Sequence, residues 1–265
     1  MISRFIAPFV LTAACIFPVM QACAENESGS PHTAVGERDS ASVVDSVLSS
    51  IIATTDTTGM VSVHKDTESY VDSKTRYTSI SEADFRKVAD ELGLEVAVIK
   101  AVVEIEAGQS MKGFWAPGVP VVNFDASTCA RYRKKGGAIP QKNAKVPSGL
   151  SGYPLKEWRQ LTDARHRDAK SANMGTFWGM FQIGGFNYKL CGCHSVEEFV
   201  DLMSYSELDQ LELFAAFVRN TGMLKYLKSK DWAGFALRYN GPSYKKRGYH
   251  TRMAQAYARY KNKKK

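Results

Sequence analysis

The chain has 265 residues, of which 44% are hydrophobic and 23% charged, and its formal net charge is +8. This length and apolar content are enough to bury a sizeable core, which excludes a chain too small to fold and favours one principal domain with an appendage. The charge is uneven, because residues 25–78 carry four basic and nine acidic side chains and residues 79–265 carry 30 and 18. The basic part is therefore expected to attract polyanions.

The first 24 residues have the features of an export signal. Arg4 precedes an apolar run from Phe5 to Met20, and Ala22-Cys23-Ala24 has the small residues of a signal-peptidase site. The run is shorter than a typical membrane span, so no stable membrane insertion is expected after the signal is removed. We predict an exported protein, periplasmic or secreted. The alternative is a lipoprotein acylated on Cys23, although the residues before this cysteine differ from the usual small-residue box.

Residues 25–78 are predicted to be a flexible, partly disordered leader, because most of them are polar and lack the apolar content to fold. Between Ser42 and Thr54, apolar pairs repeat every four residues, which predicts a short amphipathic helix. Its polar face is made of Ser and Asp, so packing is favoured over a membrane-surface role.

The folded domain is predicted to span residues 79–265 and to be mainly α-helical. Ser81 and Asp84 form a capping signal for a first helix that ends at Gly93. Helical patterns resume at Leu155, and the last helix is expected from Tyr249 to Tyr260. The helices between them are expected to start after three capping residues, Ser195, Ser206 and Asp231.

Two non-helical segments lie in the first half of this domain. Val121–Asp125 is the only segment with a strand-like pattern, and it ends in an acid. Residues 131–153 are basic and rich in Gly and Pro, which is typical of a long surface loop at the edge of a binding cleft.

The helix expected to begin at Glu95 carries the strongest candidate for a catalytic residue, Glu106. Helical spacing places Ile99, Val102 and Val103 on the same side as Glu106, so its carboxyl lies at the end of a buried apolar stripe. Loss of hydration disfavours the charged form and raises the pKa of Glu106, which suits a general acid near neutral pH. A carboxylate that merely caps its own neighbourhood is the structural alternative.

The residues around Glu106 are expected to have ordinary structural roles. Glu104 points elsewhere and follows Lys100 by four residues, the spacing of a surface ion pair. Gly108 suits a left-handed cap at the end of the helix.

Two aromatic, Gly-rich segments interrupt the later helices, residues 175–188 (GTFWGMFQIGGFNY) and 238–244 (RYNGPSY). Aromatic rings stack on pyranose faces, and amides bond to hydroxyl and acetamido groups, so this composition suits a sugar-binding groove. The alternative is that Trp178 and Phe181 belong to the core.

Three cysteines follow the signal region. In an oxidising compartment Cys129 could pair with Cys191 or Cys193, and the sequence leaves the pairing open. The five histidines are scattered and form no ligand pair at helical spacing, so we expect neither a metal nor another cofactor.

In chain order, the segments KAVVEIEAGQSMKGF, VVNFD, FWGMFQIGGFNY and FALRYNGPSY resemble the N-acetylmuramidase family of phage endolysins and bacterial wall hydrolases. The resemblance extends from about Leu92 to Tyr257. It implies a lysozyme-like, mainly helical fold that cuts the glycan of peptidoglycan.

By position, the resemblance implies catalytic roles for Glu106, Asp125 and Tyr239. With the aromatic segments, it implies substrate-binding roles for five residues: Trp178, Gln182, Asn187, Tyr188 and Asn240. The family typically has a glutamate where this chain has Asp125, and serines where it has Ala107 and Phe177. Because aspartate is one methylene shorter, a base or electrostatic role for Asp125 requires the backbone to come closer.

The reaction implied is cleavage between N-acetylmuramic acid and N-acetylglucosamine. Glu106 would protonate the leaving oxygen, while Asp125 would stabilise positive charge or orient water. If neither carboxyl activates water, the muramyl O6 attacks instead, which makes the protein a lytic transglycosylase with 1,6-anhydro products. A third alternative is a non-catalytic wall-binding protein. The expected partner is the peptidoglycan glycan strand, bound by a monomer, and nucleic acid is not expected because the protein is exported.

Overall fold

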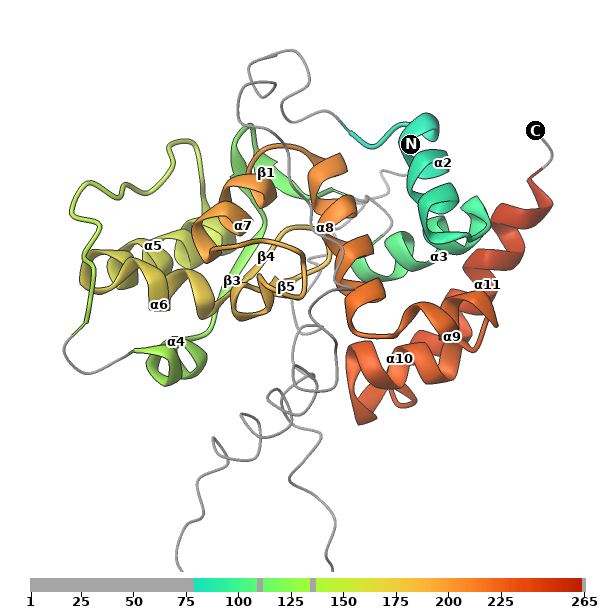
Figure 1. Cartoon of the computed structure of the whole chain (residues 1–265). Helices are drawn as coiled ribbons and strands as arrows, with labels where there is room; N and C mark the ends of the chain where they lie inside the picture. Colours follow the sequence, from blue (N-terminus) through green and yellow to red (C-terminus); the bar gives the residue numbers. More distant parts are fainter. Residues whose placement is uncertain (1–78, 109–111, 134–136, 264–265) are drawn as a thin grey trace, which may run out of the picture.

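The computed structural model describes residues 79–108, 112–133 and 137–263 (Figure 1). The predicted signal peptide, the Cys23 alternative and the leader with its amphipathic helix all lie outside these residues. Within the described ranges, no helix is long and apolar enough to cross a membrane.

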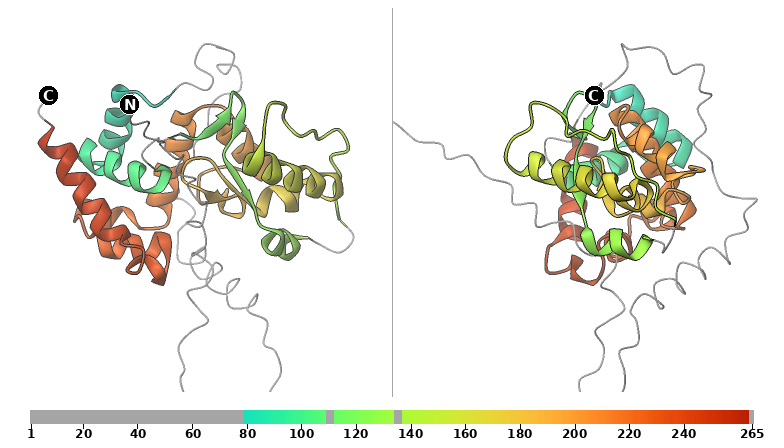
Figure 2. Two further views of the ribbon diagram at one scale, coloured as in Figure 1. Left: turned by 180° about the vertical axis from the view of Figure 1, so that it is seen from behind. Right: turned by 90° about the vertical axis from the view of Figure 1, so that its left-hand side faces the viewer.

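One lobe consists of helices and contains both the first and the last helix of the described residues, α2 and α11. The C-terminal helix α11 packs along α3 and α10, and α2 packs on α3, as the views in Figures 1 and 2 show. The lobe comprises α2 (Glu82–Leu92), α3 (Val96–Ala107), α9 (Leu224–Lys228), α10 (Trp232–Asn240), the 3-10 turn η4 (Pro242–Tyr244) and α11 (Tyr249–Asn262).

The second lobe surrounds a small antiparallel sheet with the strand order β3-β4-β5. Val122 of β3 pairs with Trp178 of β4, and Phe177 of β4 pairs with Gly184 of β5. A separate hairpin of β1 and β2 precedes the sheet. The lobe comprises β1 (Phe114–Ala116), β2 (Val119–Pro120), β3 (Val122–Phe124), α4 (Ala126–Tyr132), α5 (Gly152–Arg167), α6 (Ala169–Met174), β4 (Thr176–Trp178), β5 (Ile183–Gly184), the 3-10 turn η3 (Gly185–Asn187) and α7 (Val196–Met203).

Helix α8 (Glu207–Asn220) lies between the lobes, where it contacts α2 on one side and α7 on the other. Its apolar residues Leu211, Phe214 and Val218 have no exposed surface. Because α8 touches both lobes, its buried side chains can set the position of one lobe against the other.

The predicted helix starts are confirmed where capping residues mark them. Ser81 and Asp84 form a complete capping box, in which each side chain accepts from the other residue's backbone N–H, and Gly93 ends α2 with φ of 62°. The side chains of Ser195, Ser206 and Asp231 accept from the first turns of α7, α8 and α10. These ends could be predicted because a cap involves only neighbouring residues.

The predicted strand is confirmed as β3, within Val121–Asp125, and β1, β2, β4 and β5 form in addition to it. Each has two or three residues, too few to show an alternating pattern in the sequence. The described part of the 131–153 loop is attached to the end of α5. The N–H of Gln141 donates to the Arg165 carbonyl at 2.9 Å, and the N–H of Ala169 donates to the Ile139 carbonyl at 2.9 Å.

The expected disulfide is absent from the described residues, because Cys129, Cys191 and Cys193 are all free and buried. Cys129 faces α6 from α4, with its thiol 3.9 Å from the Ser171 hydroxyl. Cys191 and Cys193 instead lie in the turn between η3 and α7. The sequence left this pairing open, because pairing depends on which elements meet, and spacing in the sequence does not reveal that.

Candidate active site

Glu106 lies in the last turn of α3, and its side chain is half-buried. The predicted stripe is confirmed, since Ile99, Val102 and Val103 have no exposed surface, and it widens to nearly the whole helix. Gly108 has φ of 77° and ψ of 175°, so the chain leaves α3 in an extended conformation open only to glycine. A positive φ was expected there, but the left-handed cap was not formed.

The surroundings of Glu106 favour its protonated form near neutral pH. Burial raises the pKa of Glu106 to about 7, against the opposing effects of the hydrogen bond from Asn240 and the positive charge of Arg252. The Asn240 Nδ2 donates to Oε1 of Glu106 at 3.0 Å. Asn240, assigned to substrate binding from the sequence, therefore holds the candidate acid.

The predicted ion pair between Lys100 and Glu104 was wrong. Glu104 pairs with Arg259 of α11, and Lys100 pairs with Glu82 of α2. Each side chain meets an opposite charge on the neighbouring helix, and these contacts between helices replace the weak pair within α3.

Asp125 follows β3 directly and is the N-cap of α4. Its Oδ1 accepts from the Thr128 N–H at 2.6 Å and from the Ser127 hydroxyl at 2.6 Å. Although burial would raise the pKa of Asp125, the hydrogen bonds from Ser127 and Thr128 lower it below its usual value. Asp125 is therefore an ionised, half-buried carboxylate whose position is fixed at the start of a helix.

The Tyr239 ring lies inside an aromatic cluster. It stacks on Phe235 at 5.5 Å between ring centroids and meets Phe214 edge-on at 5.7 Å. Its hydroxyl donates to the Phe181 carbonyl at 2.8 Å, so it holds the loop between β4 and β5 against α10. Burial, and then the charge of Glu106, raise the pKa of Tyr239 well above its usual value.

Trp178 cannot bind sugar in this structure, which corrects its assignment. The side chain has no exposed surface, its indole N–H donates to the Asn173 carbonyl at 3.0 Å, and its ring meets Trp158 edge-on. Because β4 is the middle strand of the sheet, its alternate side chains point into the core. The alternative of a core residue was right for Trp178 and for Phe181, which is 3% exposed.

Gln182 has two features of a functional residue. Its φ is 50°, uncommon for a residue with a side chain, and its buried Oε1 has no hydrogen-bond partner. Its Nε2 donates to the Gly179 carbonyl at 2.7 Å, which fixes the amide orientation. A strained backbone and an unsatisfied acceptor both cost free energy, and a ligand that supplies a donor would recover part of it.

Asn187 and Tyr188 lie at the end of η3, where Asn187 is buried and Tyr188 is half-buried. Their carbonyls both accept from the Cys191 N–H at 3.1 Å. This turn follows β5 and so positions the far end of the Gln182 loop.

Two hydrogen bonds and the adjacency of residues along the sequence connect four of the eight predicted site residues: Glu106, Asn240, Tyr239 and Gln182. Glu106 accepts from Asn240, the neighbouring Tyr239 donates to Phe181, and Gln182 comes next. Asp125 stands apart from these residues, on β3 and α4. Among the described residues, the groups that shift the pKa of Glu106 are Asn240 and Arg252.

Two buried residues of α8, Glu207 and Gln210, belong to the surroundings of the site and were not predicted from the sequence. Gln210 accepts from the Met180 N–H at 2.8 Å and donates to the Gly113 carbonyl at 3.2 Å, while Glu207 accepts from the Gly113 N–H at 2.9 Å. They join the segment after α3 to the loop that carries Gln182. The signal available was helical spacing: Glu207 and Gln210 each lie four residues before an apolar core residue, Leu211 and Phe214, and so extend the apolar face of α8.

The comparisons with known proteins identify the family of the chain. The model of the N-acetylmuramidase family matches residues 95–261. The chain belongs to the N-acetylmuramidase family. This match contains Glu106, Asp125 and all five residues assigned to substrate binding, and it confirms the resemblance drawn from the sequence motifs.

The mainly helical fold of this N-acetylmuramidase family member is shared with a solved structure. The crystal structure of the endolysin of Burkholderia phage AP3 is 35% identical and matches with a TM-score of 0.59. The match covers 70% of this chain and 71% of the endolysin chain. No curated protein matches the chain.

Proposed function

We propose that this protein is a peptidoglycan hydrolase that cleaves the glycosidic bond between N-acetylmuramic acid and N-acetylglucosamine, with Glu106 as the general acid. The observation that carries the proposal is the raised pKa of Glu106, about 7, at the end of a buried helix. A general acid must still hold its proton near neutral pH, and few carboxyl groups do. Membership of the N-acetylmuramidase family supports the same reaction class.

Asn240 decides which oxygen of Glu106 can deliver the proton. Its Nδ2 donates to Oε1, so Oε1 is already an acceptor and the proton belongs on Oε2. In the proposed mechanism, Oε2 protonates the glycosidic oxygen as the bond breaks. Asn240 then stabilises the carboxylate that remains.

Asp125 is the proposed second carboxyl group. Because it is ionised, it can stabilise the positive charge that develops on the sugar ring. Its Oδ1 is occupied by Ser127 and Thr128, which leaves Oδ2 for substrate or water.

Gln182 is the proposed anchor for an acetamido group. Its Oε1 is buried and has no hydrogen-bond partner in this structure, so it would accept from the N–H of an N-acetyl substituent once the loop between β4 and β5 moves to expose it. The bond from Nε2 to the Gly179 carbonyl sets the orientation of the amide. Asn187 and Tyr188 are proposed to line the same region.

A lytic transglycosylase is the second candidate. The observation in its favour is that capping of α4 uses one oxygen of Asp125, which weakens the case for Asp125 as a base that activates water. In that reaction the muramyl O6 would attack, and the products would carry 1,6-anhydro ends.

One experiment separates these reactions. Purified residues 25–265 are incubated with insoluble peptidoglycan beside Glu106→Gln, and the soluble products are identified by mass spectrometry. Reducing muramic-acid ends from the wild type alone support the hydrolase, and 1,6-anhydro ends support the transglycosylase. Equal release by the variant would exclude Glu106 as the acid, and binding to the wall without products would favour the non-catalytic alternative.

We further propose that the protein is exported, on the evidence of the first 24 residues. The mass of the mature protein tests this. Cleavage after Ala24 is expected, and a diacylglyceryl group on Cys23 would establish the lipoprotein instead.

A further inference from the structure

Arg252 is a cation that the proposed mechanism does not use, and it lines a hollow together with Ile105, the residue before Glu106. It lies in the first turn of α11, is exposed to solvent, and its charge acts on Glu106. Its guanidinium carbon is 5.9 Å from the centre of the Tyr249 ring. The side chain lines a hollow of about 190 Å³ between α3 and α11, together with Glu104, Ile105, Gln255 and Arg259.

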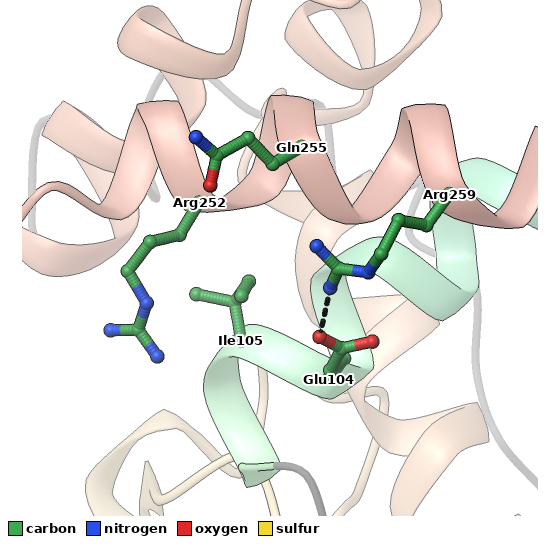
Figure 3. Close-up of a pocket in the computed structure, with 5 residues that line it drawn as sticks. All are labelled: Glu104, Ile105, Arg252, Gln255 and Arg259. Atoms are coloured by element: carbon green, nitrogen blue, oxygen red, sulfur yellow. Dashed lines mark hydrogen bonds and ion pairs between the residues drawn. The ribbon is translucent and has the colours of Figure 1, made fainter.

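The two arginines that line this hollow differ in their partners. Arg259 turns to the Glu104 carboxylate, whereas the Arg252 guanidinium extends past Ile105, clear of Glu104 (Figure 3). Among the described residues, Arg252 has no carboxylate partner. An arginine presents a planar fork of N–H donors that matches a carboxylate, so this side chain is available to an anion from outside the chain.

The positive charge of Arg252 acts against the proposed role of Glu106 as a general acid. Asn240 and Tyr239 of α10 and Arg252 of α11 are the groups that interact with Glu106, and Arg252 is the only cation among them in the described structure. A positive charge stabilises the carboxylate and so lowers the pKa of a group that must stay protonated. This cost is removed if an anion of the substrate neutralises the guanidinium when it binds.

The proposed substrate supplies such an anion. The bond to be cut is uncharged, but the peptide stem on each N-acetylmuramic acid carries free carboxylates. We propose that Arg252 binds a carboxylate of the peptide stem beside the bond that is cut, so that the enzyme prefers peptide-bearing glycan. This inference rests on the proposed function. It implies that the bound stem, by neutralising Arg252, keeps a larger fraction of Glu106 protonated near neutral pH.

The test compares two soluble substrates prepared from one peptidoglycan. One keeps its peptide stems, and an amidase has removed the stems of the other, which leaves only the lactyl carboxylate on each muramic acid. The variants are Arg252→Gln, Arg252→Lys, and Lys261→Gln as a control that removes one positive charge from the same helix away from the hollow. The measurements are kcat/KM on each substrate and its pH profile.

We expect Arg252→Gln to lose about ten-fold or more in kcat/KM on the peptide-bearing substrate, which is the effect of losing one charge-assisted hydrogen bond. On the stripped substrate the loss in kcat/KM should be less than about two-fold. Arg252→Lys should recover part of the loss, and Lys261→Gln should match the wild type. Because the cation no longer opposes protonation, Arg252→Gln should also move the alkaline limb of kcat/KM to higher pH. A merely structural role would not move this limb.

Three results would overturn the inference: equal losses on both substrates, a loss confined to the stripped glycan, or no loss. The first would mean a structural role and the second recognition of the lactyl carboxylate. If the wild type released no product, the proposed function would fail separately. Sedimentation with intact and stripped peptidoglycan, in the Glu106→Gln background with and without Arg252→Gln, would still measure recognition of the stem.

Discussion

Four effects act on the carboxyl group of Glu106. Burial disfavours the carboxylate, and the end of α3 adds the negative pole of the helix dipole, while Asn240 and Arg252 act in the opposite direction. Burial prevails, so the group is poised near neutral pH. A single residue therefore sets the pH range in which the proposed reaction can run.

The first prediction concerns that range. Because the acid must be protonated, kcat/KM should fall as the pH rises through about 7, the value to which burial raises the pKa of Glu106. Glu106→Gln should lose about 10²–10⁴-fold in rate below pH 7, the usual contribution of general acid catalysis, and its own profile should lack this alkaline limb. Glu91→Gln, an exposed carboxylate on α2, is the control and should match the wild type. A wild-type profile that stays flat to pH 9 would contradict the assignment.

The second prediction separates the two roles of Asp125. Serine is also a good N-cap, so Asp125→Ser should keep the stability of α4, whereas Asp125→Ala should lose about 1 kcal/mol. Both variants lack the carboxylate and should lose activity to a similar extent. Urea unfolding and product release measure the two effects. If Asp125→Ser were fully active, Asp125 would have only its capping role.

At the scale of elements, α8 is the part that holds the site together. Gln210 bonds to Met180, Gly113 and the Met203 carbonyl, and so joins the segment after α3 to the loop before Gln182. We call the hydrogen bonds of Gln210 to Met180, Gly113 and Met203 the Gln210 clamp. A Cβ at residue 113 would lie 2.1 Å from the Gln210 Oε1, so these bonds form only with glycine at this position. Glycine at this point lets two backbones approach the same buried amide.

The third prediction tests this clamp. Gln210→Leu removes three hydrogen bonds from a fully buried position and leaves backbone groups unsatisfied, so it should destabilise the protein by about 1–3 kcal/mol in urea unfolding. Gln160→Leu on the exposed face of α5 is the matched control and should stay within about 0.5 kcal/mol. An unchanged unfolding midpoint for Gln210→Leu would show that the clamp contributes nothing.

At the scale of the whole molecule, the described core runs from Ile80 to Tyr260 without a break between the lobes. The last helix, α11, covers α3, so the C-terminal end of the chain completes the environment of Glu106. The candidate site consequently depends on both ends of the domain.

The fourth prediction follows from that continuity. Residues 79–265 alone should fold with the thermal midpoint of residues 25–265 and keep their activity on soluble glycan, because the described core contains its own packing partners. Calorimetry and product release measure both properties. A large fall in the midpoint would mean that residues 25–78 are part of the fold.

The sequence by itself determined the features that depend on neighbours in the chain. Ser81, Ser195 and Asp231 marked helix starts because a cap joins residues three apart, and the spacing of Ile99, Val102 and Val103 placed Glu106 at the end of a buried apolar stripe for the same reason. The four motifs, in order, identified the family.

Only the tertiary structure decided which distant segments meet. It buried Trp178 in the middle strand, turned Asn240 toward Glu106, paired Glu104 with Arg259 and left three buried thiols without a disulfide. It also placed Arg252, 146 positions after Glu106, beside the acid. Contacts of this kind follow from how α3, α10 and α11 pack, and a local sequence pattern does not predict which distant helices meet.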